Sequence, residues 1–191
     1  MKRISKRFCI RRLVAAGLTL ILASNANANG NVNTNANSND WQSPQTIVQA
    51  LYETISADAG VQRDWDRYRA LFLDGASLSV AMDSKIGSGI MTMSSEELIS
   101  QTETAYGTTG FHEIPLVTRV EQHGLLASVM SSFEVRLRRS DKEPLMRGLN
   151  HFQLLNDGER WWIVSNVGAL ETKMSPLPTD LLPATPKGVA K

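Results

Sequence analysis

The hydrophobic pattern changes its period near Gly110, and this change constrains the fold more than any other feature. Before Gly110, apolar residues recur at helical spacing, as in helices that bury one face. After it come four segments that alternate or are continuously apolar, as strands are, at residues 112–122, 127–138, 145–155 and 160–168. Helices followed by a run of strands predict an α+β fold, with a long antiparallel sheet that curves around the helices.

Three helices are predicted ahead of most of the sheet, at residues 44–59, 65–73 and 95–106. Each has a recognisable start: Ser43 followed by Pro44, Asp64, and the capping box that begins at Ser94. A short strand at residues 76–82 and a glycine-containing return at 86–93 separate the second helix from the third. Asp157 and Gly158 predict a tight hairpin between the last two strands, because this pair tolerates positive φ.

The N-terminus has the layout of a secretory signal peptide at residues 1–28. Six basic residues come first, then an apolar run of residues 13–23, then small residues at 26–28. The apolar run is about half the length that spans a bilayer, so no stable membrane anchor is expected after cleavage. The pattern predicts a periplasmic or secreted bacterial protein. Export by the Sec route and by the twin-arginine route both remain open.

Composition excludes several functional classes. Cys9, the one cysteine, leaves with the signal peptide, so disulfides and thiol chemistry are not expected in the mature chain. Six of the 20 basic residues and none of the 19 acidic ones lie in residues 1–28. The mature chain therefore has a net charge of about −5, which argues against nucleic acid as a partner. The three histidines have no metal-ligand spacing, so neither a metal nor another cofactor is expected.

The chain divides into four parts. Asn occupies every odd position from 25 to 39, and such a polar repeat predicts a flexible linker over residues 29–39. Four of the seven prolines lie within residues 173–191, which predicts an extended, unpacked tail. Between them, residues 40–172 are long enough for one domain with a sizeable core.

Several segments of this predicted domain resemble the NTF2-like superfamily, in particular its secreted, SnoaL-like bacterial branch. The segments that carry the resemblance are residues 64–72, 74–76, 95–99, 110–113, 147–150 and 154–164. The resemblance implies a cone-shaped fold whose open mouth, between helices and curved sheet, holds a small hydrophobic ligand, often in a homodimer. Members of the superfamily include isomerases, dehydratases, cyclases and domains that only bind, so the fold alone assigns no reaction.

Strand alternation assigns polar residues to faces, because residues of one parity share a face. On the first long strand, His112 shares parity with Ile114, Leu116 and Val120. His112 is therefore predicted to face inward, and Glu113 to point away. Because histidine titrates near neutral pH, His112 is the predicted catalytic acid or base. Two alternatives remain open for it, a contact to the ligand and a hydrogen-bonded histidine at the edge of the sheet.

Four further residues are candidates for ligand binding. Ser131 and Asn150 are predicted on the inward faces of the second and third long strands. Asn150 could bind the ligand or satisfy a backbone group. Trp65 and Tyr68 share one helix face, where they either pack in the core or form a wall of the ligand site. Apart from His112, no inward acidic or basic side chain is predicted.

Three functions are compatible with these residues. The first is an exported pocket domain that binds a small apolar or amphipathic molecule. The second is an enzyme of the isomerase, cyclase or lyase type that uses His112 for proton transfer. The third is an interaction module that dimerises through the outer face of the sheet and whose cone is filled by side chains.

Overall fold

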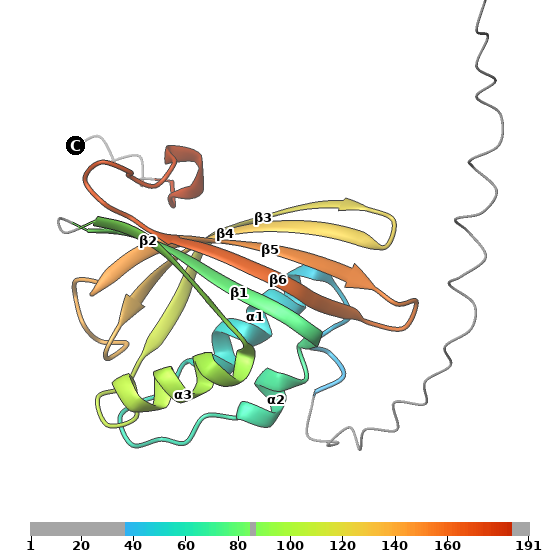
Figure 1. Cartoon of the computed structure of the whole chain (residues 1–191), viewed down its shortest axis with the longest axis horizontal. Coiled ribbons are helices and arrows are strands. Elements are labelled where there is room, and N and C mark those ends of the chain that lie inside the picture. Colours follow the sequence, from blue (N-terminus) through green and yellow to red (C-terminus); the bar gives the residue numbers. More distant parts are fainter. Residues whose placement is uncertain (1–36, 85–86, 185–191) are drawn as a thin grey trace, which may run out of the picture. The chain divides into compact units, whose positions relative to one another are not determined.

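The computed structural model describes residues 37–84 and 87–184, in which a curved sheet lies over three α-helices (Figure 1). The helices are α1 (Pro44–Ile55), α2 (Trp65–Arg69) and α3 (Ser95–Tyr106), with a 3-10 helix, η1 (Thr179–Leu181), near the end. The strands are β1 (Phe72–Ser84), β2 (Gly87–Met93), β3 (His112–His123), β4 (Leu126–Arg136), β5 (Met146–Asn156) and β6 (Trp161–Leu170). The predicted signal peptide and most of the predicted linker lie outside the described residues.

The six strands form one sheet in the order β2-β1-β6-β5-β4-β3. The predicted α+β class and the meander from β3 to β6 are confirmed, but the sheet is not wholly antiparallel. β1 runs parallel to β6, because both strands begin at the same end of the sheet, where Phe72 pairs with Ile163. This pairing joins segments far apart in the sequence, and local alternation carries no information about it.

The helices begin where the sequence predicted but are not grouped at the N-terminus. Ser43 and Ser94 form capping boxes at the starts of α1 and α3, and Asp64 caps α2. α2 is shorter than predicted, because Phe72 already belongs to β1. In the described part of the chain, α1 and α2 precede the sheet, whereas α3 follows the hairpin of β1 and β2. A group of three N-terminal helices is therefore not found among the described residues, whereas the strand and return predicted between the second and third helices correspond to β1 and β2.

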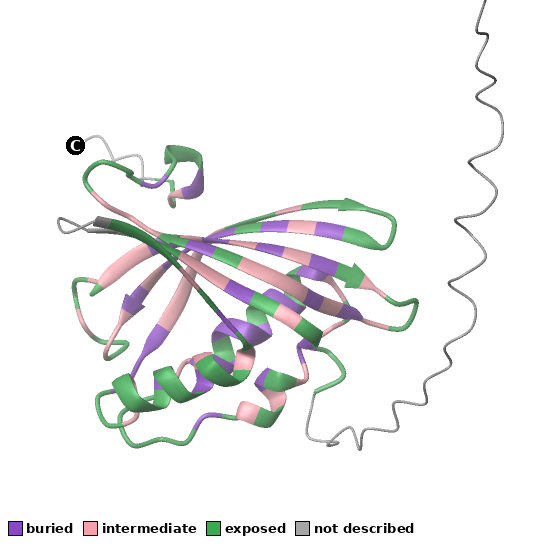
Figure 2. Ribbon diagram, in the orientation of Figure 1, coloured by how far each residue is buried: buried purple, intermediate pink, exposed green. Residues whose placement is uncertain are grey.

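The core lies between the helices and the concave face of the sheet, where buried positions face each other in Figure 2. Its largest fully buried side chains include Tyr52, Tyr68, Phe152, Ile47 and Leu71. Burial of these side chains is the main favourable contribution to stability. Among residues 37–84 and 87–184, no helix has the length and apolar character needed to cross a membrane.

A stack of three side chains fixes the start of the domain. The Arg160 guanidinium lies between the rings of Trp41 and Trp162, 3.7 Å from each ring centroid. Arg160 Nη2 also donates to the carbonyl oxygen of Ala70, which follows α2. Burial lowers the pKa of Arg160 to about 10, so the side chain remains charged at neutral pH. The stack thus joins the segment before α1, the end of α2 and the β5–β6 hairpin.

The described part of the C-terminal segment packs against the sheet, which corrects the prediction of an unpacked tail. Leu177 and Leu181 are buried, and the Ser132 hydroxyl donates to the carbonyl oxygen of Leu181 at 2.5 Å. Arg119 pairs with Asp180 at 2.7 Å. The segment lies on the side of the sheet opposite to the helices (Figure 1). The domain therefore continues at least to residue 184.

Candidate functional site

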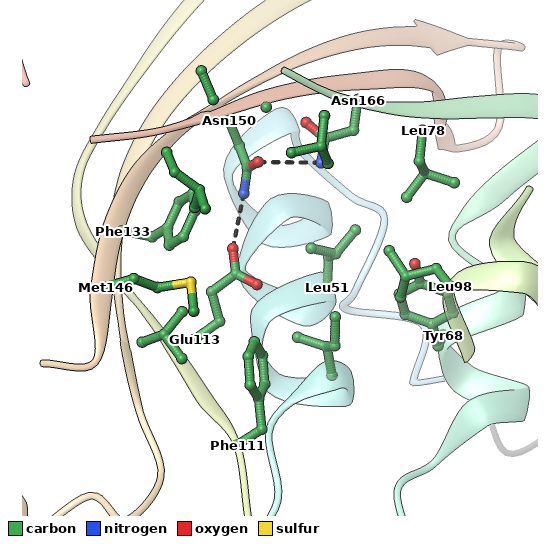
Figure 3. Close-up of a pocket in the computed structure, with 16 residues that line it drawn as sticks. Leu51, Tyr68, Leu78, Leu98, Phe111, Glu113, Phe133, Met146, Asn150 and Asn166 are labelled. Atoms are coloured by element: carbon green, nitrogen blue, oxygen red, sulfur yellow. Dashed lines mark hydrogen bonds between the residues drawn. The ribbon is translucent and has the colours of Figure 1, made fainter. Parts of the chain in front are cut away.

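A partly enclosed cavity of about 170 Å³ lies between the helices and the concave face of the sheet (Figure 3). Its walls are mostly apolar, and the polar side chains that line it are Tyr68, Glu113, Asn150 and Asn166. The apolar walls include Leu51, Ile55, Leu78, Val80, Leu98, Phe111, Phe133, Val135, Met146 and Leu170. A cavity of about 150 Å³ is known to accept benzene, so this one suits a molecule of about one ring. The cavity contradicts the expectation of a cone filled by side chains.

A β-bulge in β3 places Glu113 in the cavity and His112 outside it. Pro115 pairs with Phe133 and Val117 pairs with Ser132, so Leu116 is an extra residue without a partner on β4. One extra residue exchanges the two faces of a strand. Before the bulge it is therefore the odd-numbered residues of β3 that face inward, and the predicted faces of His112 and Glu113 are both wrong.

A chain of amide hydrogen bonds holds the Glu113 carboxylate. Asn150 Nδ2 donates to Glu113 Oε1 at 2.9 Å, and Asn166 Nδ2 donates to Asn150 Oδ1 at 3.3 Å (Figure 3). Asn150 Nδ2 also lies 3.4 Å from the Tyr52 hydroxyl oxygen. Burial raises the pKa of Glu113 to about 7, although the hydrogen bond from Asn150 opposes this shift. The carboxyl group therefore gains and loses its proton near neutral pH.

The Glu113 side chain lies in the cavity lining among mostly apolar side chains. It extends among Phe111, Phe133 and Met146, and Leu51 lies across from it (Figure 3). Water solvates a carboxylate poorly in such surroundings, which explains the raised pKa.

Tyr68 lines the cavity from α2. Its side chain is fully buried, and its oxygen has no hydrogen-bond partner among the residues that the structure describes. Trp65 packs edge-on against the Tyr68 ring, with 5.4 Å between centroids. The pKa of Tyr68 is raised, first by burial and then by the charge of Glu113, so the hydroxyl stays protonated at neutral pH.

His112 is a hydrogen-bonded edge histidine, which was one of the alternatives for it. Its ring is buried, and Nε2 lies 2.9 Å from Asp58 Oδ1 in the loop after α1. In the register of the sheet it pairs with Arg136, on the face away from the cavity. His112 is therefore not placed to act on a molecule in the cavity, and the catalytic role predicted for it is withdrawn.

The four predicted ligand-binding residues divide into two pairs. Tyr68 and Asn150 line the cavity, and their contact with a ligand stays a prediction. Trp65 is not part of the lining, and its indole N–H donates to Glu103 Oε1 at 2.9 Å. Ser131 is fully buried but is not part of the lining, and its hydroxyl lies 2.9 Å from the Thr118 hydroxyl. Trp65 and Ser131 thus support the site without lining it.

Sequence reasoning missed Glu113 and Asn166. For Glu113 a usable signal was present, because Pro115 lies within the predicted strand, and proline in a sheet is confined to edges and bulges. β3 is an edge strand, and Pro115 directly precedes the bulge. For Asn166 no signal existed, because the last strand is apolar on both faces and its orientation could not be assigned.

Solved structures with the same arrangement of elements support the fold assignment. A protein of unknown function with a cystatin-like fold from Nostoc punctiforme is 13% identical, with a TM-score of 0.51; the match covers 68% of this chain and 89% of that one. An NTF2-like protein of unknown function from Pseudomonas putida is 12% identical, with a TM-score of 0.51; the match covers 73% of this chain and 93% of that one. No protein-family model and no curated protein matches the sequence. The chain therefore has the NTF2-like fold, as the sequence resemblance implied.

Proposed function

We propose that this is an exported domain of the SnoaL-like type whose cavity binds a small, mainly apolar molecule with one polar group. The observation that carries the proposal is Tyr68, a residue of the cavity lining whose fully buried hydroxyl lacks a partner among the described residues. Buried hydroxyl groups nearly always form a hydrogen bond, so a bound molecule is a natural partner. The layout of residues 1–28 supports export.

Native mass spectrometry of the protein purified from the periplasm tests this proposal. The wild type is expected to retain a small molecule, and Tyr68→Phe to lower the affinity by about tenfold, because one hydrogen bond to the ligand is lost. The free energy of unfolding should not fall in Tyr68→Phe, because the hydroxyl has no partner to lose in the described structure.

Tyr106→Phe is the matched control, because Tyr106 packs against Phe111 outside the cavity lining. It should retain the molecule as the wild type does. Equal retention by Tyr68→Phe and the wild type would contradict the proposed role of this hydroxyl.

Proton transfer by Glu113 is a second candidate function. Its carboxyl group has a pKa of about 7, and a general base works best when its pKa is close to the working pH. The hydroxyl of Tyr68, which lines the same cavity, could stabilise negative charge that develops on a substrate. An isomerase, cyclase or lyase reaction would then use Glu113 in the role predicted for His112. This function would be supported if the wild type converts the retained molecule chemically and Glu113→Gln does not.

We also propose that two copies of the chain dimerise through the outer face of the sheet. Met130, His151 and Val167 form one row across three strands, and Met130 and Val167 are exposed. Leu126 and Leu155 extend this exposed surface toward the β3–β4 turn. In register the row continues to Arg119 on β3, which pairs with Met130 and forms an ion pair with Asp180. A two-fold interface brings a patch against itself, and a row whose one cationic neighbour is already paired limits repulsion of like charges.

Sedimentation velocity tests the dimer. The double variant Met130→Asp, Val167→Asp is expected to raise the dissociation constant by at least about a hundredfold, because carboxylates would be buried without partners. Leu145→Asp is the control, because Leu145 is similarly exposed but lies in the loop between β4 and β5. A monomeric wild type, or equal effects of both changes, would contradict the proposed interface.

A further inference from the structure

We propose that the cavity selects a molecule whose polar group is a protonated amine. This inference rests on the proposed binding function and specifies the chemical class of the ligand. It follows from the kind of polar atoms that line the cavity, from the charge that these atoms carry, and from the apolar character of the other walls.

The direction of the amide chain leaves hydrogen-bond acceptors at both of its ends. An ionised carboxylate only accepts, so Asn150 must direct its NH₂ group toward Glu113. The oxygen of Asn150 then accepts from the NH₂ group of Asn166. The remaining oxygen of Asn166, Oδ1, is buried and has no partner among the described residues. Asn166 Oδ1 is thus an unpaired acceptor at one end of the amide chain, and the Glu113 carboxylate is a charged acceptor at the other.

The charge of the cavity is not compensated by the residues that line it. Among the described lining residues there is no lysine, arginine or histidine, and Glu113 is the one with a carboxylate. A buried carboxylate without a cation is costly, and the raised pKa of Glu113 reflects this cost. A ligand ammonium group would supply the missing positive charge, whereas a ligand carboxylate would be repelled.

The Tyr68 hydroxyl completes the set of polar groups. It approaches the cavity from α2, whereas Glu113 approaches from β3 (Figure 3). A primary ammonium group donates N–H bonds only, and the Glu113 carboxylate, the charged acceptor in the lining, can accept from it. The apolar walls would surround the remainder of the ligand, for which about one ring is a suitable size.

Three probes of similar shape test the selection: benzylamine, benzyl alcohol and benzoate. Binding to the full mature chain is measured by calorimetry at about pH 8, where a primary amine is still protonated. Chemical shifts of the lining methyl groups, such as those of Val135 and Met146, establish that a probe enters the cavity. Benzylamine is expected to bind about tenfold tighter than benzyl alcohol, and benzoate most weakly.

The pH profile separates an ionic contact from a neutral one. Binding of benzylamine should weaken as the pH falls from about 8 to about 5.5, where Glu113 takes up a proton, and binding of benzyl alcohol should not. The other titratable groups near the carboxyl do not change charge in this interval. Burial raises the pKa of Tyr52 and of Tyr68, and Arg69 lowers that of Glu96 on α3. His112 faces the other side of the sheet.

Glu113→Gln has the same size and replaces one acceptor oxygen by an N–H donor, so it should abolish the preference for benzylamine. Glu134→Gln is the matched control, because Glu134 pairs with Ile114 on the opposite face of the same strands and should leave all three affinities unchanged. Equal binding of benzylamine and benzyl alcohol in the cavity would overturn the inference and leave the proposed function standing. If none of the three probes shifts the lining methyl groups, the proposed function fails as well.

Discussion

Between pH 4.5 and pH 7, the stability of the wild type relative to Glu113→Gln is expected to fall by about 3 kcal/mol. Below pH 4.5 the carboxyl is protonated in both the folded and the unfolded chain, so its titration has no effect. Between pH 4.5 and pH 7 the folded chain keeps a proton that the unfolded chain has released. Each pH unit therefore lowers the free energy of unfolding of the wild type by about 1.4 kcal/mol. Above pH 7 both states are ionised, and the loss is complete.

Urea denaturation of both proteins across this pH interval measures the effect, because all other titrating groups cancel in the difference. Glu134→Gln serves as the control, since this residue lies on the opposite face of the sheet and its difference from the wild type should stay nearly constant. A constant difference for Glu113→Gln as well would mean that the carboxyl has an ordinary pKa and is therefore well solvated.

A loss of this size would indicate that Glu113 serves a site and not the fold. A neutral side chain of the same size would satisfy Asn150 equally well and would not need to be ionised inside the protein. Groups that reduce stability in this way occur at functional sites, where binding or chemistry requires them. The buried hydroxyl of Tyr68, a lining residue of the same cavity, likewise has no partner among the described residues.

The order of elements could be predicted because each has a local cause. Ser43 and Ser94 cap the two long helices as expected, and Gly158 takes the positive φ that its hairpin requires. The alternation of apolar residues located β3 to β6 to within about two residues. These features depend on neighbours along the chain, which a sequence displays directly.

A correct prediction of the site required two features that are not local in the sequence. The bulge at Leu116 exchanged the faces of His112 and Glu113, so a correct strand assignment led to the wrong candidate. The position of Asn166 depends on the pairing of β6 with β1 and β5, which the pattern of β6 itself does not determine. An error of one residue in register is small for the fold but decides which side chain enters the cavity.

The C-terminal segment is expected to contribute as much to stability as a core element, although its composition predicted disorder. Leu181 is almost completely buried, so Leu181→Ala should lower the free energy of unfolding by about 3 kcal/mol, the usual cost of a buried leucine. Thermal or urea unfolding measures the change, with Met174→Ala as the control, since Met174 lies in the same segment and is 89% exposed. If both variants match the wild type, the segment does not pack stably. A loss specific to Leu181→Ala would show that burial of this leucine is needed to hold the segment on the sheet, beside the hydrogen bond from Ser132 and the ion pair of Arg119 with Asp180. Proline assists by lowering the entropy that the segment loses on packing.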